Sequence, residues 1–317
     1  MQTSNSLWAQ TMARLFGKAY LMQSPKRSRK RSITRRCLVE ALEVRTVFSA
    51  SFGSALSIDN SQARDVATDT AGNSYVTGNF SGTVDFDQSR THVGDVDILT
   101  ARGGTESTDA YIAKYAPDDS LVWVRRMGGD RETTGGTITD VGRNIAVDAG
   151  GGVYVSGEFW DSADFGSTTL NSSGTRGSFV SKLDAGGSFV WSVNLGVGYA
   201  AQKGMDIDSQ GNVFVLTRPG ATTIDIRKLG PNGQAVWLKS LQISNFWSGD
   251  LDVDGTGNVV IVGGFSQTVD FDPGSKVKSI SVGSRNASFV LELDSQGSFK
   301  WVSHFVGTGQ VYADSVT

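Results

Sequence analysis

The stretch that decides the fold is Phe179-Val180-Ser181-Lys182-Leu183-Asp184-Ala185-Gly186-Gly187-Ser188-Phe189-Val190-Trp191-Ser192. An alternating run, a turn rich in residues that tolerate positive φ, and a second run ending in tryptophan predict a β-hairpin. The same order of run, turn and run surrounds three more tryptophans, Trp123, Trp237 and Trp301. The four copies are therefore interpreted as one repeated hairpin.

A second hairpin alternates with the first along the chain. Its turn reads Asp-x-x-Gly-Asn after Asp69, Asp208 and Asp254, and it is modified to a glycine pair after Asp148. Two hairpins in each copy predict four four-stranded modules near residues 63–128, 142–196, 203–241 and 249–306. The copies differ in length mainly between their second and third strands, which predicts an insertion-tolerant loop there.

A four-stranded meander cannot cover both of its own faces, so successive copies must stack. The sequence thus predicts an all-β fold over residues 47–317, a β-propeller of about four four-stranded antiparallel blades. Trp123, Trp191, Trp237 and Trp301 are then expected to pack between blades rather than to form an aromatic cage for a ligand. The four repeat aspartates are expected to set the turns.

The two ends of the repeat region carry partial copies. Residues 48–53 align with the fourth strand of the other copies, and residues 312–317 resemble the opening of a first strand. Either a four-bladed ring with loose ends or an incomplete, truncated arc satisfies this pattern. An open arc would expose an apolar blade face, so we expect it to self-associate and to be poorly soluble.

Composition excludes several kinds of chemistry. The 317 residues include 39 Gly but only two His and one Cys, so neither an intrachain disulfide nor a closed structural zinc site can form. The glycine excess fits the repeated turns. Residues 1–50 hold ten Lys or Arg against two Glu, which leaves 19 basic and 30 acidic residues for 51–317. An acidic body repels phosphates and predicts no nucleic-acid partner.

The basic leader, residues 1–46, has two interpretations. Trp8, Met12, Leu15 and Phe16 lie at helical spacing, which predicts an amphipathic helix at a membrane surface. The alternative is a disordered segment that is removed. No run in the chain approaches the roughly 18 apolar residues of a membrane span, so no transmembrane segment is predicted.

Residues 35–50 resemble the N-terminal LEPR-type motif of large planctomycete surface and exported proteins. The matching core is Leu38-Val39-Glu40-Ala41-Leu42-Glu43-Val44-Arg45, in which Val39 interrupts the first Leu-Glu pair. The motif's last leucines are replaced by Val47-Phe48. This resemblance implies export to the cell envelope or beyond.

The repeats resemble the SBBP-type β-propeller repeats of bacterial cell-surface proteins over about residues 47–317. The best copies are Asn79-Phe80-Ser81-Gly82-Thr83-Val84-Asp85-Phe86-Asp87 and Gly264-Phe265-Ser266-Gln267-Thr268-Val269-Asp270-Phe271-Asp272. The second unit has the weaker Ala163-Asp164-Phe165-Gly166, and the third lacks this element. The resemblance implies a propeller and brings no common catalytic residues.

Few residues suggest site chemistry. The pairs Asp85/Asp87 and Asp270/Asp272 are candidate calcium ligands, with strand-end capping and turn formation as the alternative role. No catalytic residue and no other cofactor is predicted. The loops at 87–109 and 128–140 are the expected places for contact with a protein or glycan ligand.

These observations favour a non-catalytic, exported cell-surface or envelope propeller that serves as a binding or structural scaffold. One alternative is a propeller hydrolase or lyase that acts on a polysaccharide, which would need several charged side chains in a central pocket. The other is a truncated remnant of a larger surface protein.

Overall fold

The computed structural model describes residues 58–87, 97–103, 107–129, 139–166, 168–307, 313 and 315–316. The chain divides into two compact units, Met1–Gly53 and Ser54–Thr317, and every described residue lies in the second. The predictions for the basic leader, for the LEPR-like motif and for a strand at residues 48–53 fall outside the described residues. So do most of the two expected ligand loops.

The described residues form four four-stranded antiparallel sheets and no helix, which confirms the prediction of an all-β chain built from such modules. Sheet 1 contains β1 (Ser61–Thr68), β2 (Ser74–Phe80), β5 (Asp109–Tyr115) and β6 (Leu121–Met127). Sheet 2 contains β7 (Val141–Val147), β8 (Val153–Phe165), β9 (Thr168–Leu183) and β10 (Phe189–Val197). Sheet 3 contains β11 (Tyr199–Ile207), β12 (Val213–Arg218), β13 (Thr223–Leu229) and β14 (Ala235–Gln242). Sheet 4 contains β15 (Trp247–Val253), β16 (Val259–Asp270), β17 (Ser279–Leu293) and β18 (Phe299–Val306).

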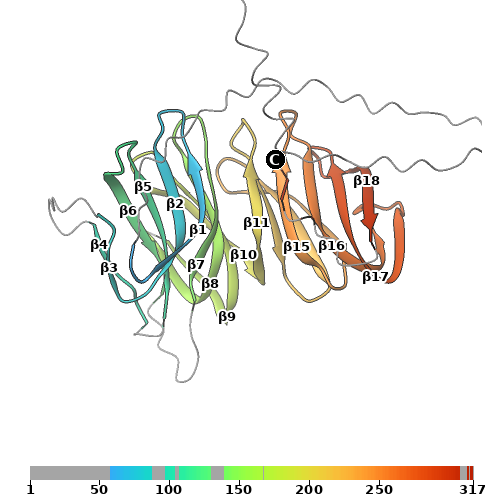
Figure 1. Cartoon of the computed structure of the whole chain (residues 1–317), viewed down its shortest axis with the longest axis horizontal. Coiled ribbons are helices and arrows are strands. Elements are labelled where there is room, and N and C mark those ends of the chain that lie inside the picture. The colour runs from blue at the N-terminus through green and yellow to red at the C-terminus, as the bar shows by residue number, and fades with distance from the viewer. Residues whose placement is uncertain are drawn as a thin grey trace, which may run out of the picture. The chain divides into compact units, whose positions relative to one another are not determined.

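The sheets stand side by side in chain order (Figure 1). Their first strands contact one another in sequence, β1 with β7, β7 with β11 and β11 with β15. Three hydrophobic cores fill the interfaces between consecutive sheets, because the alternating apolar side chains of each strand face a neighbouring sheet. A fourth cluster, around Phe80, Phe86 and Tyr111, belongs to sheet 1 alone. No contact of comparable extent joins β15 to β1 in the described part of the chain.

The variable segment between second and third strands is not a plain loop, which corrects the prediction from sequence. In sheets 2 and 4 the two central strands continue beyond the sheet as a hairpin arm after a shift in register. In sheet 1 the arm is a separate pair, β3 (Thr83–Asp85) with β4 (Ile98–Thr100). Sheet 3 has no arm, since β12 passes to β13 by a short turn.

Each arm folds back onto its own sheet through one phenylalanine. Phe86 packs on Tyr111, Phe165 on Phe179 and Phe271 on Phe289, with ring centroids 4.7–4.9 Å apart. All three phenylalanines of the arms are fully buried. The recurring Asp-Phe pattern in the sequence therefore marks the point where an arm is anchored.

Candidate functional site

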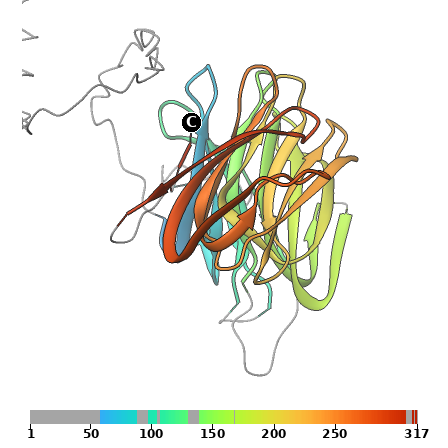
Figure 2. The same cartoon turned by 90° about the vertical axis from the view of Figure 1, so that its right-hand side faces the viewer.

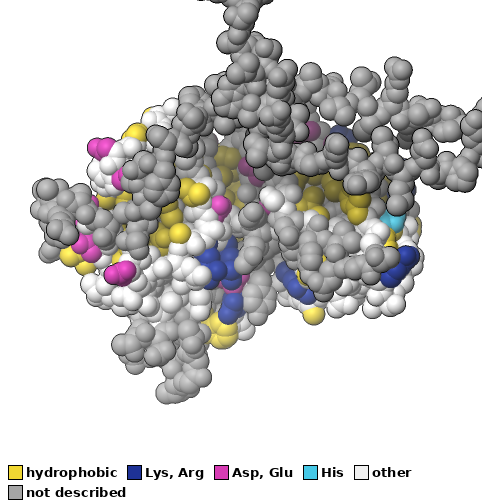
Figure 3. Space-filling model, viewed as in Figure 1, with side chains coloured by type: hydrophobic (Ala, Val, Ile, Leu, Met, Phe, Trp, Pro, Cys, Tyr) yellow, Lys and Arg dark blue, Asp and Glu magenta, His cyan; other side chains and the backbone are white. Residues whose placement is uncertain are grey.

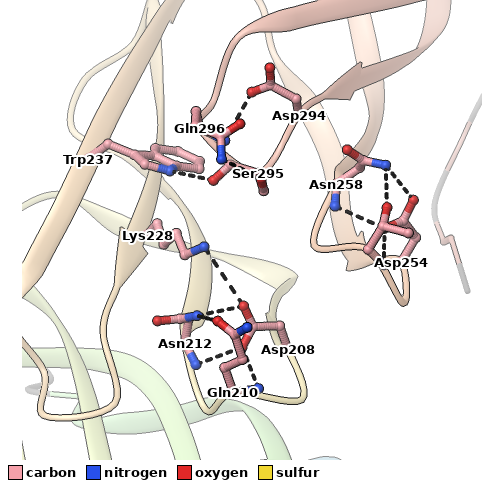
Figure 4. A network of polar contacts seen from close by, with 11 residues as sticks. Asp208, Gln210, Asn212, Lys228, Trp237, Asp254, Asn258, Asp294, Ser295 and Gln296 are labelled. Carbon is pink, nitrogen blue, oxygen red and sulfur yellow. Dashed lines mark hydrogen bonds and ion pairs between the residues drawn. The ribbon is translucent and has the colours of Figure 1, made fainter.

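Three of the four repeat tryptophans join one sheet to the next. The indole N–H of Trp123 donates to the carbonyl of Ala185 in the turn between β9 and β10, at 3.2 Å. Trp191 donates to Pro231 at 2.9 Å, and Trp237 donates to Ser295 at 3.1 Å (Figure 4). We call this repeated contact the indole joint. Because each bond links a fourth strand to the following sheet, it fixes the stacking order.

The fourth tryptophan makes no such contact with another described sheet. Trp301 lies on β18, the outer strand of sheet 4, and its indole N–H donates to Glu292 of the same sheet. Its side chain is 41% exposed, whereas Trp123 is 7% exposed. The structure thus separates one repeat tryptophan from the other three.

The repeat aspartates Asp69, Asp148, Asp208 and Asp254 close the turns between first and second strands. The Oδ1 atom of Asp208 accepts the backbone N–H groups of Gln210 and Asn212, both at 2.9 Å (Figure 4). The other three copies repeat this pair of bonds. The side-chain amide of Asn73 lowers the pKa of Asp69, against the opposing effect of burial. An aspartate that binds its own backbone in this way forms an Asx-type turn.

The candidate calcium ligands lie in two different arms. Asp85 is the last residue of β3 and Asp270 is the last residue of β16, and Asp87 and Asp272 each lie two residues beyond. The Oδ1 atom of Asp85 accepts the N–H of Asp87 at 2.9 Å, and that of Asp270 accepts the N–H of Lys278 at 2.7 Å. These bonds set the turns that bury Phe86 and Phe271. No group of three or more His, Cys, Asp or Glu that could hold a metal occurs among the described residues.

A cluster of charged residues, most of whose carboxylates are buried, lies where sheets 1 and 2 meet, and we call it the charged junction. It contains four carboxylates and four arginines: Asp109, Asp140, Glu158, Asp164, Arg102, Arg126, Arg143 and Arg176. Arg126 pairs with Asp109 at 2.7 Å. Glu158, whose side chain is only 1% exposed, pairs with Arg143 at 2.9 Å and with Arg176 at 2.8 Å. Two arginines at once compensate this buried carboxylate, as a charge in the interior requires.

Burial governs the ionisation of two of these acids. Burial raises the pKa of Asp140 to about 7, and the nearby Asp109 carboxylate contributes in the same direction. The backbone N–H groups of Trp160 and Gly129 donate to Asp140 and only partly oppose this. Burial also raises the pKa of Asp109, while the bonds from Arg126 and Arg102 act against the rise.

The two loops expected to contact a ligand start from this junction. Thr108 and Thr139, at the described ends of the two loops, form a parallel bridge, and the N–H of Asp140 donates to the carbonyl of Thr108 at 2.9 Å. The N–H of Arg102 donates to Asp109 at 3.0 Å. Lys and Arg side chains gather over the lower part of β7–β9, beside acidic side chains (Figure 3). The structure therefore brings the bases of both loops to one charged region.

The charged junction was not predictable from the sequence. Its members are spread from Arg102 to Arg176 and show no repeated spacing. Strand pairing within sheet 2 brings Arg143 and Arg176 to Glu158, and the stacking of sheets 1 and 2 brings Arg102 to Asp164. The only local signal was an unusual density of charge around residues 125–131 and 140–143. His304, on β18, lies apart from the junction, and His92 falls outside the described residues.

The described residues define an all-β protein of stacked four-stranded antiparallel sheets, with a charged junction between the first two sheets. No protein-family model matches the chain, and no curated protein matches it. Among the described residues, no helix is long and apolar enough to cross a membrane.

Proposed function

We propose that this protein is a non-catalytic, exported cell-surface or envelope β-propeller that acts as a binding or structural scaffold. The four sheets are its blades. The observation that carries the proposal is the indole joint, made three times at 2.9–3.2 Å between consecutive sheets. Repeated joints of this kind give a rigid array, and rigid arrays of sheets typically present loops for binding. Export follows from the resemblance of residues 35–50 to the LEPR-type motif.

The loops rooted at the charged junction are the proposed ligand surface. A hydrogen bond from the N–H of Asp140 to the carbonyl of Thr108 joins the bases of the two loops, so both loops start from fixed positions. Arg126 and Arg143 keep side chains that are 18% exposed, and Arg176 keeps one that is 29% exposed. Arginine side chains suit the carboxylate or sulfate groups of acidic glycans and the acidic side chains of proteins. The proposed ligand is a protein or a glycan.

A polysaccharide hydrolase or lyase is the competing function, and the raised pKa of Asp140 is the observation in its favour. General acid catalysis needs the carboxyl group to reach the substrate. Asp140 and Asp109 are only 2% and 1% exposed. Both oxygens of Asp140 accept backbone N–H groups. We therefore assign Asp140 to holding the loop bases.

The test is to incubate the full chain with a panel of neutral and acidic polysaccharides and to follow two readouts. Affinity electrophoresis measures retention, and assays for new reducing ends and for unsaturated uronates measure cleavage. We expect retention by at least one acidic polysaccharide without cleavage. Release of reducing or unsaturated ends would instead establish an enzyme.

A pair of loop variants locates the binding surface. Replacing residues 130–138 by a Gly-Ser segment of equal length should abolish retention. The matched control places the same kind of segment at 274–277, in the tip of the sheet 4 arm, and should bind like the original protein. Equal binding by both variants would contradict the loop assignment.

A further inference from the structure

Sheet 4 presents an outer face that no other described sheet covers. In Figure 2 this face is turned toward the viewer. Trp301 is 41% exposed there and Phe305 is 55% exposed, both on β18 and on the same face of that strand. Large apolar side chains that cluster on a surface typically mark an interaction site.

The three indole joints show what this face can receive. In each joint the indole lies against a glycine two residues beyond the accepting carbonyl, namely Gly187, Gly233 or Gly297. These glycines have φ of +80°, +78° and +76°. A Cβ atom at Gly187 would lie 2.7 Å from the Trp123 ring, and one at Gly233 would lie 2.9 Å from the Trp191 ring. One at Gly297 would lie 3.2 Å from the Trp237 ring and 2.8 Å from the side chain of Lys239. The joint therefore needs a turn that has both a carbonyl acceptor and a glycine.

Sheet 4 carries the donating half of this joint. Trp301 pairs across strands with Glu292, in the register that Trp123, Trp191 and Trp237 keep with Lys114, Lys182 and Lys228. Glu292 satisfies the indole N–H while the face is open.

An aspartate on β15, the first strand of sheet 4, accepts a backbone N–H in the way that elsewhere links consecutive sheets. The N–H of Val316 donates to Asp250 at 2.9 Å. The N–H of Ile145 donates in the same way to Asp65, and that of Val253 donates to Asp206, each at 2.9 Å. In both of those pairs the acceptor lies on the first strand of one sheet and the donor on the first strand of the next. At Asp250, Val316 therefore supplies the N–H that the first strand of the next sheet supplies in the other two pairs.

A second copy of this chain does not offer the matching half. Among the four described sheets, the one third-to-fourth-strand turn outside the three joints is that of sheet 1, where Asp119 stands at the glycine position with φ of +65°. Its Cβ atom would occupy the space that the indole ring needs. Two of the three joints would place such a Cβ atom less than 3.0 Å from the ring, a distance that real Cβ atoms essentially never show, and the third would place it closer than ordinary van der Waals contact. The side chain of Asp119 therefore hinders the indole ring of Trp301 from packing against this turn, both in this chain and in another copy.

We propose that Trp301 and Phe305, on the outer face of β18, form a docking surface for a β-sheet module on a partner polypeptide. The partner's edge turn carries a backbone carbonyl and, two residues later, a glycine at positive φ. Trp301 donates its indole N–H to that carbonyl, while Asp119 excludes copies of this chain from the same surface. The surface is separate from the loops to which ligand binding is assigned, so either proposal can fail without the other.

The experiment uses the chain itself as the probe, by giving its sheet 1 turn the missing glycine. In Asp119→Gly the turn matches the joint, so Trp301 can dock either in a neighbouring copy or in the same chain. Docking between copies gives a head-to-tail association that at least about doubles the mass in sedimentation at high concentration. Docking within one chain instead raises the melting temperature at unchanged mass. The increase in mass or in melting temperature should vanish in the double variant Asp119→Gly/Trp301→Ala.

Two controls separate the steric argument from charge and from backbone strain. Asp119→Asn removes the charge and keeps the Cβ atom, so it should behave like the original protein. Trp301→Ala alone corrects for the stability effect of each substitution, because the cycle of four proteins isolates the coupling between the two positions. The proposal is overturned if Asp119→Gly changes neither mass nor melting temperature in a way that depends on Trp301. It is also overturned if the unaltered chain already associates and Trp301→Ala abolishes that association.

Discussion

Replacing Trp123 by alanine tests whether the indole joint holds consecutive sheets together. The Trp123 side chain is 7% exposed, contacts Tyr75 with ring centroids 6.2 Å apart and bonds to Ala185 of sheet 2. Truncating a buried aromatic side chain costs about 3–5 kcal/mol. About 1 kcal/mol of that is the net value of a hydrogen bond. We expect Trp123→Ala to lower the free energy of unfolding by roughly 3–4 kcal/mol.

Trp301→Ala is the matched control, because the residue, the strand position and the substitution are the same. Trp301 is 41% exposed and no other described sheet lies against it. Trp301→Ala should therefore lower the free energy of unfolding by less than about 1 kcal/mol. Urea denaturation followed by circular dichroism measures both values and avoids the loss of a fluorescent probe. Comparable m-values would show that the same cooperative unit unfolds in each protein. Equal losses for the two variants, or a loss below about 1 kcal/mol for Trp123→Ala, would refute the role given to the joint.

Three further predictions concern the junction and the arms. Because burial raises the pKa of Asp140 to about 7, the folded protein holds a proton between roughly pH 4 and 7 that the unfolded chain has lost. The free energy of unfolding should therefore fall as pH rises through that window, and urea midpoints should show this slope flattened in Asp140→Asn. Phe271→Ala removes the buried ring that holds the sheet 4 arm against its sheet. It should lower the free energy of unfolding by about 3–4 kcal/mol in the same assay. Val277→Ala, at a site that is 75% exposed, should cost almost nothing, and equal costs would contradict the anchoring role. Since the carboxylate of Asp270 accepts the backbone N–H of Lys278, added calcium should leave the melting temperature unchanged. A rise that Asp270→Asn abolishes would reassign Asp270 and Asp272 as calcium ligands.

The strands could be predicted from the sequence because each hairpin, with its turn, forms within a short stretch of the chain. The turns after Asp69, Asp148, Asp208 and Asp254 are closed by bonds to residues two and four positions away, so the pattern that forms them is visible in a few letters. The turns that precede each repeat tryptophan are local as well, since in each of them a backbone N–H donates to the carbonyl three positions earlier. The arms were missed because their strands are short or continue a central strand after a change of register.

The candidate site was predicted only in outline. The loops at 87–109 and 128–140 were singled out from their polarity, but nothing in the sequence placed their bases together. The bridge between Thr108 and Thr139 joins residues 31 positions apart, and the pair between Arg102 and Asp164 joins residues 62 positions apart. Contacts of this kind depend on how sheet 1 stacks on sheet 2, and that stacking leaves no periodic trace in the charged residues.

The sequence by itself determined the repeat, the four antiparallel sheets and the turns, since alternation and turn chemistry act over a few residues. Only the tertiary structure decided what the repeated residues do. Trp123, Trp191, Trp237 and Trp301 stand in similar contexts, yet three of them bond to a following sheet and the fourth faces outward. The difference lies in the neighbouring sheet rather than in the strand that carries the tryptophan, because the accepting carbonyl and the glycine beside it belong to that neighbour.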